Sequence, residues 1–117
     1  MGGSTSYHAG LAAEDIVERA YCDRGFLPLS RRWRGSAGEI DVIIGNATQI
    51  VFVEVKKSKS FTRAAAALSE RQTRRILQTA SEFLATQPDG LLTDARVDVA
   101  LVDDAGHTRI IENALGH

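Results

Sequence analysis

Apolar residues recur at helical spacing in two parts of the chain. The first pattern predicts a helix over residues 7–24, with Gly25 at the position of its C-terminal cap. The second predicts a helix over residues 69–85, where Ser69 and Gln72 have the spacing of a capping box. The apolar stripe of this second helix comprises Ile76, Leu77, Ala80, Phe83 and Leu84.

Five further segments have the composition of β-strands, and they span residues 26–34, 39–44, 49–57, 96–102 and 107–111. Pro28 lacks a backbone donor, which favours an edge position for the first strand. The third strand is continuously apolar over residues 50–53, as expected where helices cover both faces of a sheet. The crossover through the second helix predicts that the third and fourth strands are parallel. We therefore expect an α/β fold in which helices flank a mixed central sheet.

Length and composition agree with one folded domain. The 117 residues are 44% hydrophobic, which excludes disorder as the main state and suffices for one core. We expect a flexible segment over residues 1–7 and a single domain over residues 8–115. No apolar run is long enough to cross a membrane, and the N-terminus does not resemble a secretory signal. Cys22 is the only cysteine, which suits a reducing, cytoplasmic location, and we expect it to fill the core.

Charge is unevenly distributed along the chain. The whole chain has 14 Lys and Arg against 15 Asp and Glu. Residues 31–75 hold ten basic and four acidic residues, a balance of +6, which leaves −7 for the remainder. If the fold gathers this segment on one side, the molecule has a positive face suited to nucleic acid. The alternative is a solvated surface on which the clustering has no role.

The second and third strands bring acidic residues together. If the turn between them is symmetric about Ala47 and Thr48, the numbers of opposed residues sum to 95. Asp41 then faces Glu54, and Glu39 faces Lys56. Opposed side chains lie about 4.5–5.5 Å apart at Cβ, where like charges destabilise the pair unless the carboxyl groups share a proton or hold a cation. A three-residue turn would place Asp41 and Glu54 on opposite faces.

Two carboxylates beside a lysine have a specific chemical use. Mg²⁺ takes oxygen ligands, commonly one or two carboxylates with water and phosphate oxygens. Such an ion lowers the pKa of bound water and polarises a phosphate oxygen, while Lys56 adds a point charge. The group therefore suits hydrolysis of a phosphodiester. The alternative is a salt-bridged cluster at an exposed hairpin end.

Four sequence blocks resemble a known family. They are GLAAE at residues 10–14, GEID at 38–41, VFVEVK at 51–56 and RVDV at 96–99. In this order they resemble the blocks of the YraN-like family, bacterial predicted endonucleases related to archaeal Holliday junction resolvases. The resemblance spans residues 8–115. It implies the three-layer restriction-endonuclease-like fold, a Mg²⁺ or Mn²⁺ cofactor and a DNA substrate.

The resemblance also implies roles for individual residues. Asp41 and Glu54 match the metal ligands, and Lys56 matches the catalytic lysine. Glu14, on the first helix, matches the glutamate that completes the metal site in the resolvase relatives. Glu39 matches the family acid that precedes the aspartate and is a further candidate contributor to the site.

The chain departs from the family pattern at three positions. Ser58 stands where the family usually has arginine, Gln72 where it often has lysine, and Val97 where phenylalanine is usual. Gln72 either contacts DNA or a ligand, or only caps its helix. These departures favour, as a second function, a weakly active or inactive nucleic-acid-binding module that retains the nuclease fold.

Basic residues of the first strand, at the end of the third strand and on the second helix are candidate DNA contacts. They are Arg31, Arg32, Arg34, Lys57, Lys59, Arg71, Arg74 and Arg75. Trp33 either stacks on a base or packs on the sheet, and we expect Asp98 to pair with Arg96 or a backbone donor. The leading hypothesis is a metal-dependent endonuclease acting on DNA, with branched or damaged DNA as candidate substrates and a homodimer as a candidate assembly. A protein-interaction domain is the third hypothesis.

Overall fold

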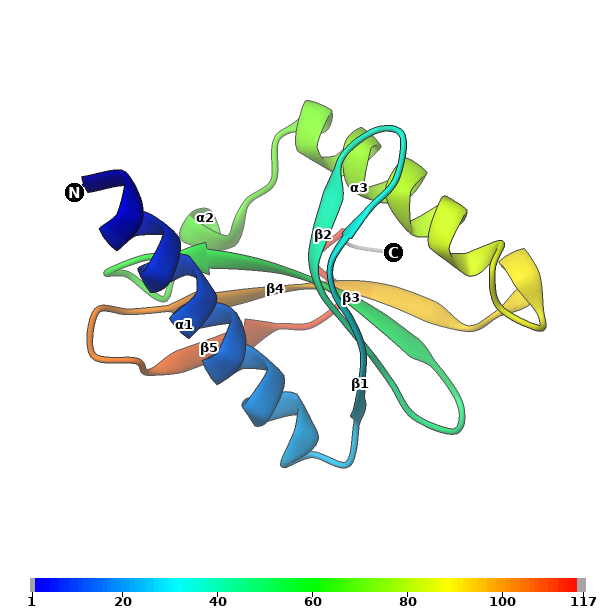
Figure 1. The fold of residues 1–117 in the computed structure, drawn as a ribbon, viewed down its shortest axis with the longest axis horizontal. Helices are drawn as coiled ribbons and strands as arrows, with labels where there is room; N and C mark the ends of the chain where they lie inside the picture. The colour runs from blue at the N-terminus through cyan, green and yellow to red at the C-terminus, as the bar shows by residue number, and fades with distance from the viewer. Residues whose placement is uncertain (1, 116–117) are drawn as a thin grey trace.

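The computed structural model describes residues 2–115 and the side chains of residues 12–115. Five strands form one sheet in the order β1-β2-β3-β4-β5, with helices on both faces (Figure 1). Neighbouring strands are antiparallel except β3 and β4, which are parallel. The predicted mixed sheet and three-layer α/β arrangement are confirmed. The strands are β1 (Leu27–Arg34), β2 (Glu39–Gly45), β3 (Ile50–Lys57), β4 (Ala95–Val102) and β5 (Thr108–Ile111).

Two long helices enclose the sheet. Helix α1 (Gly2–Cys22) covers one face and α3 (Glu70–Leu84) covers the other (Figure 1). Two short helical elements, α2 (Arg63–Ala66) and the 3₁₀ turn η1 (Gly90–Leu92), had no periodic pattern to predict them. Helix α1 begins at Gly2 and so precedes its predicted start, while the flexibility of residues 1–7 stays a prediction.

The strand β3 supplies both hydrophobic cores. Val51 and Val53 pack with α1, whereas Phe52 packs on the opposite face with Ile76 and Phe83 of α3. Alternate residues of a strand point to opposite faces of the sheet. A strand that is buried on both faces is therefore apolar at successive positions. The uninterrupted apolar run at residues 50–53 is therefore explained as predicted.

Helix α3 begins with the predicted capping box. The Ser69 hydroxyl accepts the Gln72 N–H at 3.1 Å, and the Gln72 side chain accepts the Ser69 N–H at 2.9 Å. The predicted apolar stripe is wrong at Leu77, which is 46% exposed. Thr79 is buried instead, because its hydroxyl donates to the Arg75 carbonyl at 2.8 Å and needs no external partner.

Helix α1 meets the sheet through Ala13, Glu14, Val17 and Tyr21, which share one helical face. The expectation that Cys22 fills the core is wrong, because this residue lies one position past Tyr21 and its side chain is exposed.

The rings of Trp33 and Phe83 meet edge to face at a centroid distance of 5.4 Å, so Trp33 packs on the sheet.

Asp98 is a fully buried carboxylate whose donors come from distant parts of the chain. It accepts hydrogen bonds from the Tyr21 hydroxyl at 2.7 Å, Arg96 Nε at 3.0 Å and the Asn113 N–H at 2.9 Å. Burial and the adjacent Asp98 carboxylate raise the pKa of Tyr21, which keeps this hydroxyl protonated as a donor. Asp98 thus has the structural role predicted for it and ties α1 to β4 and the C-terminal segment.

Removing the tyrosine hydroxyl should weaken this tie. We expect Tyr21→Phe to lower the free energy of unfolding by about 1.5–3 kcal/mol, the usual range for a hydrogen bond to a charged group. Urea unfolding measures the loss. In an Asp98→Asn background the same substitution should cost less, and equal costs in both backgrounds would contradict the assigned contact.

Candidate active site

The β2–β3 turn sets the register of the acidic residues. Asn46 Oδ1 accepts the N–H groups of Thr48 and Gln49, each at 2.9 Å, which closes the turn. Pairing then runs from Gly45 opposite Ile50 to Val42 opposite Val53, with every pair summing to 95. The predicted symmetric turn is confirmed. Asp41 and Glu54 are the next residues beyond the pair of Val42 and Val53, on the side away from the turn.

Strands β2 and β3 separate at Asp41. Its Oδ2 accepts the Val55 N–H at 2.8 Å. The Asp41 side chain thus accepts a hydrogen bond that a backbone carbonyl would accept in a regular antiparallel ladder. Ile40 and Ile43 both pack on the α3 side, whereas Val42 packs on the α1 side. The regular alternation expected through this stretch is therefore wrong, because a strict period of two would place Ile40 with Val42.

Glu54 is held against Asp41 in a partly buried position. Its Oε2 atom is buried and has no hydrogen-bond partner among the described residues. Burial and the adjacent Asp41 carboxylate raise the pKa of Glu54 to about 8, against the opposing effect of the Arg75 and Lys56 charges. The pair expected from the sequence is thus in place, and at neutral pH it needs a proton or a cation to relieve it.

The neighbouring ionic groups differ from the expected pairing. Lys56 donates from Nζ to the Ala67 carbonyl, and Glu39 lies 3.4 Å from Arg34 Nη2. These contacts replace the predicted Glu39–Lys56 opposition, because regular pairing ends before either residue. The Lys56 ammonium is consequently fixed near the carboxylates by the segment that leads into α3.

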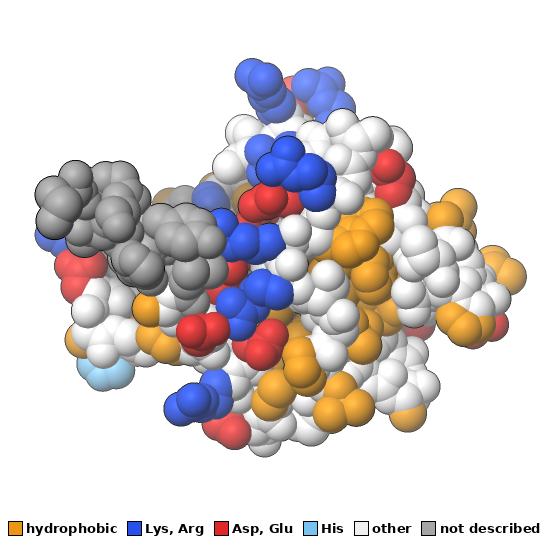
Figure 2. Space-filling view, in the orientation of Figure 1, with side chains coloured by type: hydrophobic (Ala, Val, Ile, Leu, Met, Phe, Trp, Pro, Cys, Tyr) orange, Lys and Arg blue, Asp and Glu red, His pale blue; other side chains and the backbone are white. Residues whose placement is uncertain are grey.

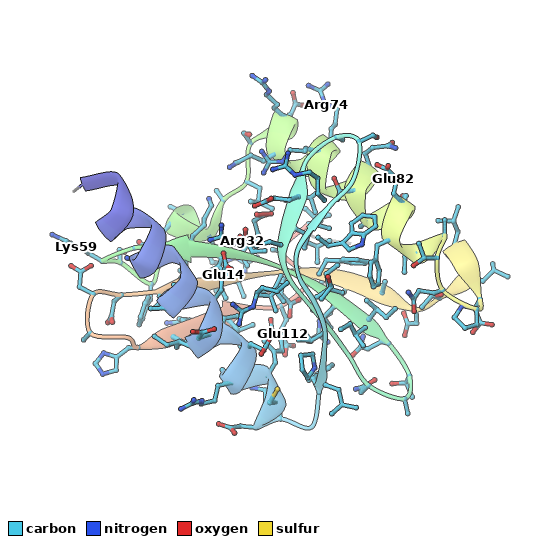
Figure 3. The ribbon with its side chains drawn as sticks, viewed as in Figure 1. Glu14, Arg32, Lys59, Arg74, Glu82 and Glu112 are labelled. Carbon is cyan, nitrogen blue, oxygen red and sulfur yellow. The ribbon has the colours of Figure 1, made fainter. Side chains whose placement is uncertain are left out.

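Glu14 is buried and held by arginines of β1. Its Oε1 accepts from Arg32 Nε at 3.0 Å and lies 3.7 Å from Arg31 Nη1. Figure 3 shows Glu14 and Arg32 close together where α1 meets the sheet. Arg32 has a φ of 52°, an uncommon conformation that interrupts the alternation of β1. Arg31 also lies on the α1 side, 2.7 Å from Asp15.

The described residues include no cluster of three His, Cys, Asp or Glu side chains arranged to hold a metal ion. The assignment of Glu14 as a third ligand stays a prediction. Asp41 and Glu54 alone fit a hard divalent cation, since Mg²⁺ commonly takes one or two carboxylates and completes its shell with water and phosphate oxygens. The buried, unpartnered oxygen of Glu54 is the atom that such an ion would satisfy.

The candidate DNA contacts divide into engaged and exposed groups. Arg31 and Arg32 contact α1, while Arg34, Lys57, Lys59, Arg71 and Arg74 are exposed. Figure 2 shows Lys and Arg side chains running from the start of α3 down the middle of the visible face, with Asp and Glu among them. The face in this view is therefore mixed in charge, and the positive face expected from the sequence stays a prediction.

Two of the three departures from the family pattern, Gln72 and Ser58, are engaged locally. Gln72 belongs to the capping box, as one of its two readings expected. The Ser58 hydroxyl donates to the Ser60 carbonyl at 2.8 Å and accepts the Ser60 N–H at 3.1 Å. Both side chains thus stabilise the ends of their own segments.

Comparison with known proteins places the chain in a family. Residues 13–102 match the profile of uncharacterised protein family UPF0102. A UPF0102 protein of Roseobacter denitrificans is 56% identical over 113 residues, which cover 97% of this chain and 88% of the relative. One from Ruegeria pomeroyi is 52% identical over 115 residues, covering 98% and 94%. The chain belongs to the UPF0102 family, which is the YraN-like family.

None of the described helices combines the length and the apolar character that a membrane span requires.

The raised pKa of Glu54 predicts a pH-dependent stability. Between about pH 4.5 and 8 the folded protein keeps a proton on Glu54 that the unfolded chain has released, so stability without metal should fall as pH rises. The free energy of unfolding should fall by at most about 1.4 kcal/mol for each pH unit through this effect. Urea unfolding at pH 5, 6, 7 and 8 measures it. Glu54→Gln should remove this pH dependence, and the exposed control Asp104→Asn should retain it. Identical slopes of the free energy of unfolding against pH in the two variants would contradict the assignment.

Glu14→Gln tests the two roles considered for Glu14. Because its carboxylate contacts Arg31 and Arg32, we expect the substitution to lower the free energy of unfolding by about 1–3 kcal/mol, as when a partly buried charged contact is lost. Calorimetric titration should show a smaller loss of Mn²⁺ affinity than in Glu54→Gln. An equal loss of affinity would place Glu14 among the metal ligands.

Proposed function

We propose that this protein is a metal-dependent endonuclease that hydrolyses phosphodiester bonds of DNA. The observation that carries the proposal is the contact between Asp41 and Glu54, where a buried carboxylate oxygen lacks a partner and Lys56 is fixed nearby. Two carboxylates and an ammonium group at the separation of two strands suit phosphoryl chemistry better than a structural salt bridge, because a salt bridge would satisfy the buried oxygen.

Each of the three residues has a distinct task in this proposal. Asp41 and Glu54 would hold Mg²⁺ or Mn²⁺, which when bound acts as a Lewis acid toward a phosphate oxygen and lowers the pKa of water. The Val55 N–H already orients the Asp41 carboxylate, so this ligand is preorganised. Lys56 adds positive charge where a phosphate would become more negative. Glu39, at the same end of β2, is a further candidate contributor.

Exposed basic residues support DNA as the substrate. Arg71 and Arg74 lie on the exposed side of the first half of α3, and Figure 3 shows Arg74 projecting from the molecule there. Lysine and arginine contacts to phosphates position a protein on DNA without reading its sequence. The family's relation to junction resolvases favours branched or damaged DNA, and a homodimer would allow two strands to be cut symmetrically.

A second candidate function is nucleic-acid binding without turnover. It is favoured by the local engagement of Ser58 and Gln72, which stand where relatives often have basic residues. A binding module would have an affinity for DNA that falls with salt, because phosphate contacts release counterions. It would cleave no substrate with either metal ion.

Cleavage assays test the proposal. Purified protein is incubated with four-way junction, flap, single-stranded and duplex DNA in Mg²⁺ or Mn²⁺. We expect at least one substrate to be cut, and we expect Asp41→Asn, Glu54→Gln and Lys56→Ala each to lower the rate by about 10²-fold or more, as for loss of a preorganised electrostatic group.

The exposed carboxylate variant Asp104→Asn is the matched control and should cleave at the wild-type rate, because its side chain is exposed in the turn between β4 and β5. Circular dichroism confirms that each variant is folded. Unchanged cleavage in Asp41→Asn or Lys56→Ala would refute the assigned site. Salt-sensitive DNA binding without cleavage would favour the binding module.

A further inference from the structure

Helix α3 holds the loop between β1 and β2 at two places. Glu82 accepts the Ser36 N–H at 3.1 Å and the Ser36 hydroxyl at 3.0 Å. Two turns earlier on the same helix, the Arg75 side chain lies against Gly38 at the other end of the loop. Figure 1 shows this loop running beside α3, and Figure 3 marks Glu82 on the helix. The path of the arginine is therefore fixed by the loop that leads into β2.

Gly38 makes room for Arg75. A Cβ atom at this position would lie 2.6 Å from Arg75 Cδ and 2.9 Å from Cγ, closer than real contacts allow. The φ of Gly38 is 154°, a value that other residues rarely adopt. A residue with a side chain at this position would displace Arg75 from the end of the loop that leads into β2.

Arg75 differs from the other cations near the site. The Arg75 side chain lies against Gly38, three residues before Asp41, which places it beside the start of the strand that carries this carboxylate. Arg75 Nε and Arg31 Nε are both buried without a hydrogen-bond partner among the described residues, but the Arg31 guanidinium is engaged by Asp15 at 2.7 Å. Lys56, by contrast, is engaged by the Ala67 carbonyl, and Arg32 by Glu14.

A buried guanidinium donor without a partner calls for an external acceptor. The planar fork of arginine matches the oxygens of a phosphate, and the adjacent Asp41 and Glu54 would present a metal ion to the same group. Arg71 and Arg74, on the same helix, are more exposed than Arg75.

We propose that Arg75 binds the phosphate group that reacts at the Asp41–Glu54 pair, and that Arg71 and Arg74 contact neighbouring phosphates of the same strand. The assignment rests on the proposed nuclease function. It makes Arg75 a catalytic residue, whereas Gly38 is a positioning residue that acts through it.

Kinetics on the cleaved DNA separate the two kinds of arginine. We expect Arg75→Ala to lower kcat by about 10²–10³-fold with little change in KM, the usual effect of losing one donor to a reacting oxyanion. Arg74→Ala should instead raise KM and reduce the salt dependence of binding by about one phosphate contact. Arg109→Ala, on β5, is the matched control with wild-type kinetics. Added guanidinium ion should restore part of the rate of Arg75→Ala and none of the rate of Lys56→Ala.

Gly38→Ala tests the positioning. It should lower kcat in the wild type, where the new Cβ displaces Arg75 and the backbone is strained, and should lower it less in an Arg75→Ala background, where only the backbone strain remains. Equal losses in the two backgrounds would overturn the role given to Gly38. Circular dichroism verifies folding of the single and double variants.

Binding of a mononucleotide tests Arg75 without relying on cleavage. Thymidine 5′-monophosphate is titrated into the protein in Mg²⁺ and followed by phosphorus NMR. Wild type and the control Arg109→Ala should bind it, and Arg75→Ala should not. If the wild type cuts no DNA but shows this pattern, the nuclease proposal fails and the phosphate site stands. Cleavage that survives Arg75→Ala unchanged, or a wild type that does not bind the mononucleotide, overturns the assignment of Arg75.

Discussion

The contact between Asp41 and Glu54 is the constraint on which the site depends. Two carboxyl groups meet where one has a buried oxygen without a hydrogen-bond partner among the described residues. Burial, and after it the adjacent Asp41 carboxylate, raises the pKa of Glu54 to about 8. The surrounding fold maintains this unfavourable contact. The closed turn at Asn46 fixes the register, and the apolar run of β3 holds Glu54 at the edge of a core packed against α3. A contact so disfavoured in isolation is typical of a functional site.

Other buried acids show how the same chain satisfies a structural charge. Asp98 receives a tyrosine hydroxyl, a guanidinium and a backbone N–H, and Glu14 receives two arginines. Both have their compensation within the protein, as buried charges require. Glu54 is the exception among these three, because its Oε2 atom is buried without a hydrogen-bond partner among the described residues and the Asp41 carboxylate adjoins it. The contrast separates acids that stabilise the fold from the one for which we propose an external partner.

The features of the fold that depend on local periodicity and on turn chemistry could be predicted from the sequence. The parallel direction of β3 and β4, the capping box at Ser69 and the register of the β2–β3 hairpin were all predicted from short-range patterns. The break in alternation at Asp41 could not be predicted, because a side chain replaces a ladder bond only after the strands have paired. The orientation of Arg32 toward Glu14 likewise depends on the positive φ of Arg32, and an arginine in the sequence does not indicate such a conformation. Leu77 was misplaced because the stripe alone does not determine how a helix is rotated on a sheet.

Charge balance links the metal ion to the phosphate in the proposed site. At neutral pH without metal, a protonated Glu54 leaves one carboxylate charge among the two cations Lys56 and Arg75. A divalent ion that displaces the proton adds more positive charge than the second carboxylate brings, so the loaded site has an excess of positive charge. A phosphodiester anion would reduce that excess, and the unpartnered Nε of Arg75 offers it a hydrogen bond. Metal and phosphate should therefore bind with mutual enhancement, since each supplies the charge that the other lacks.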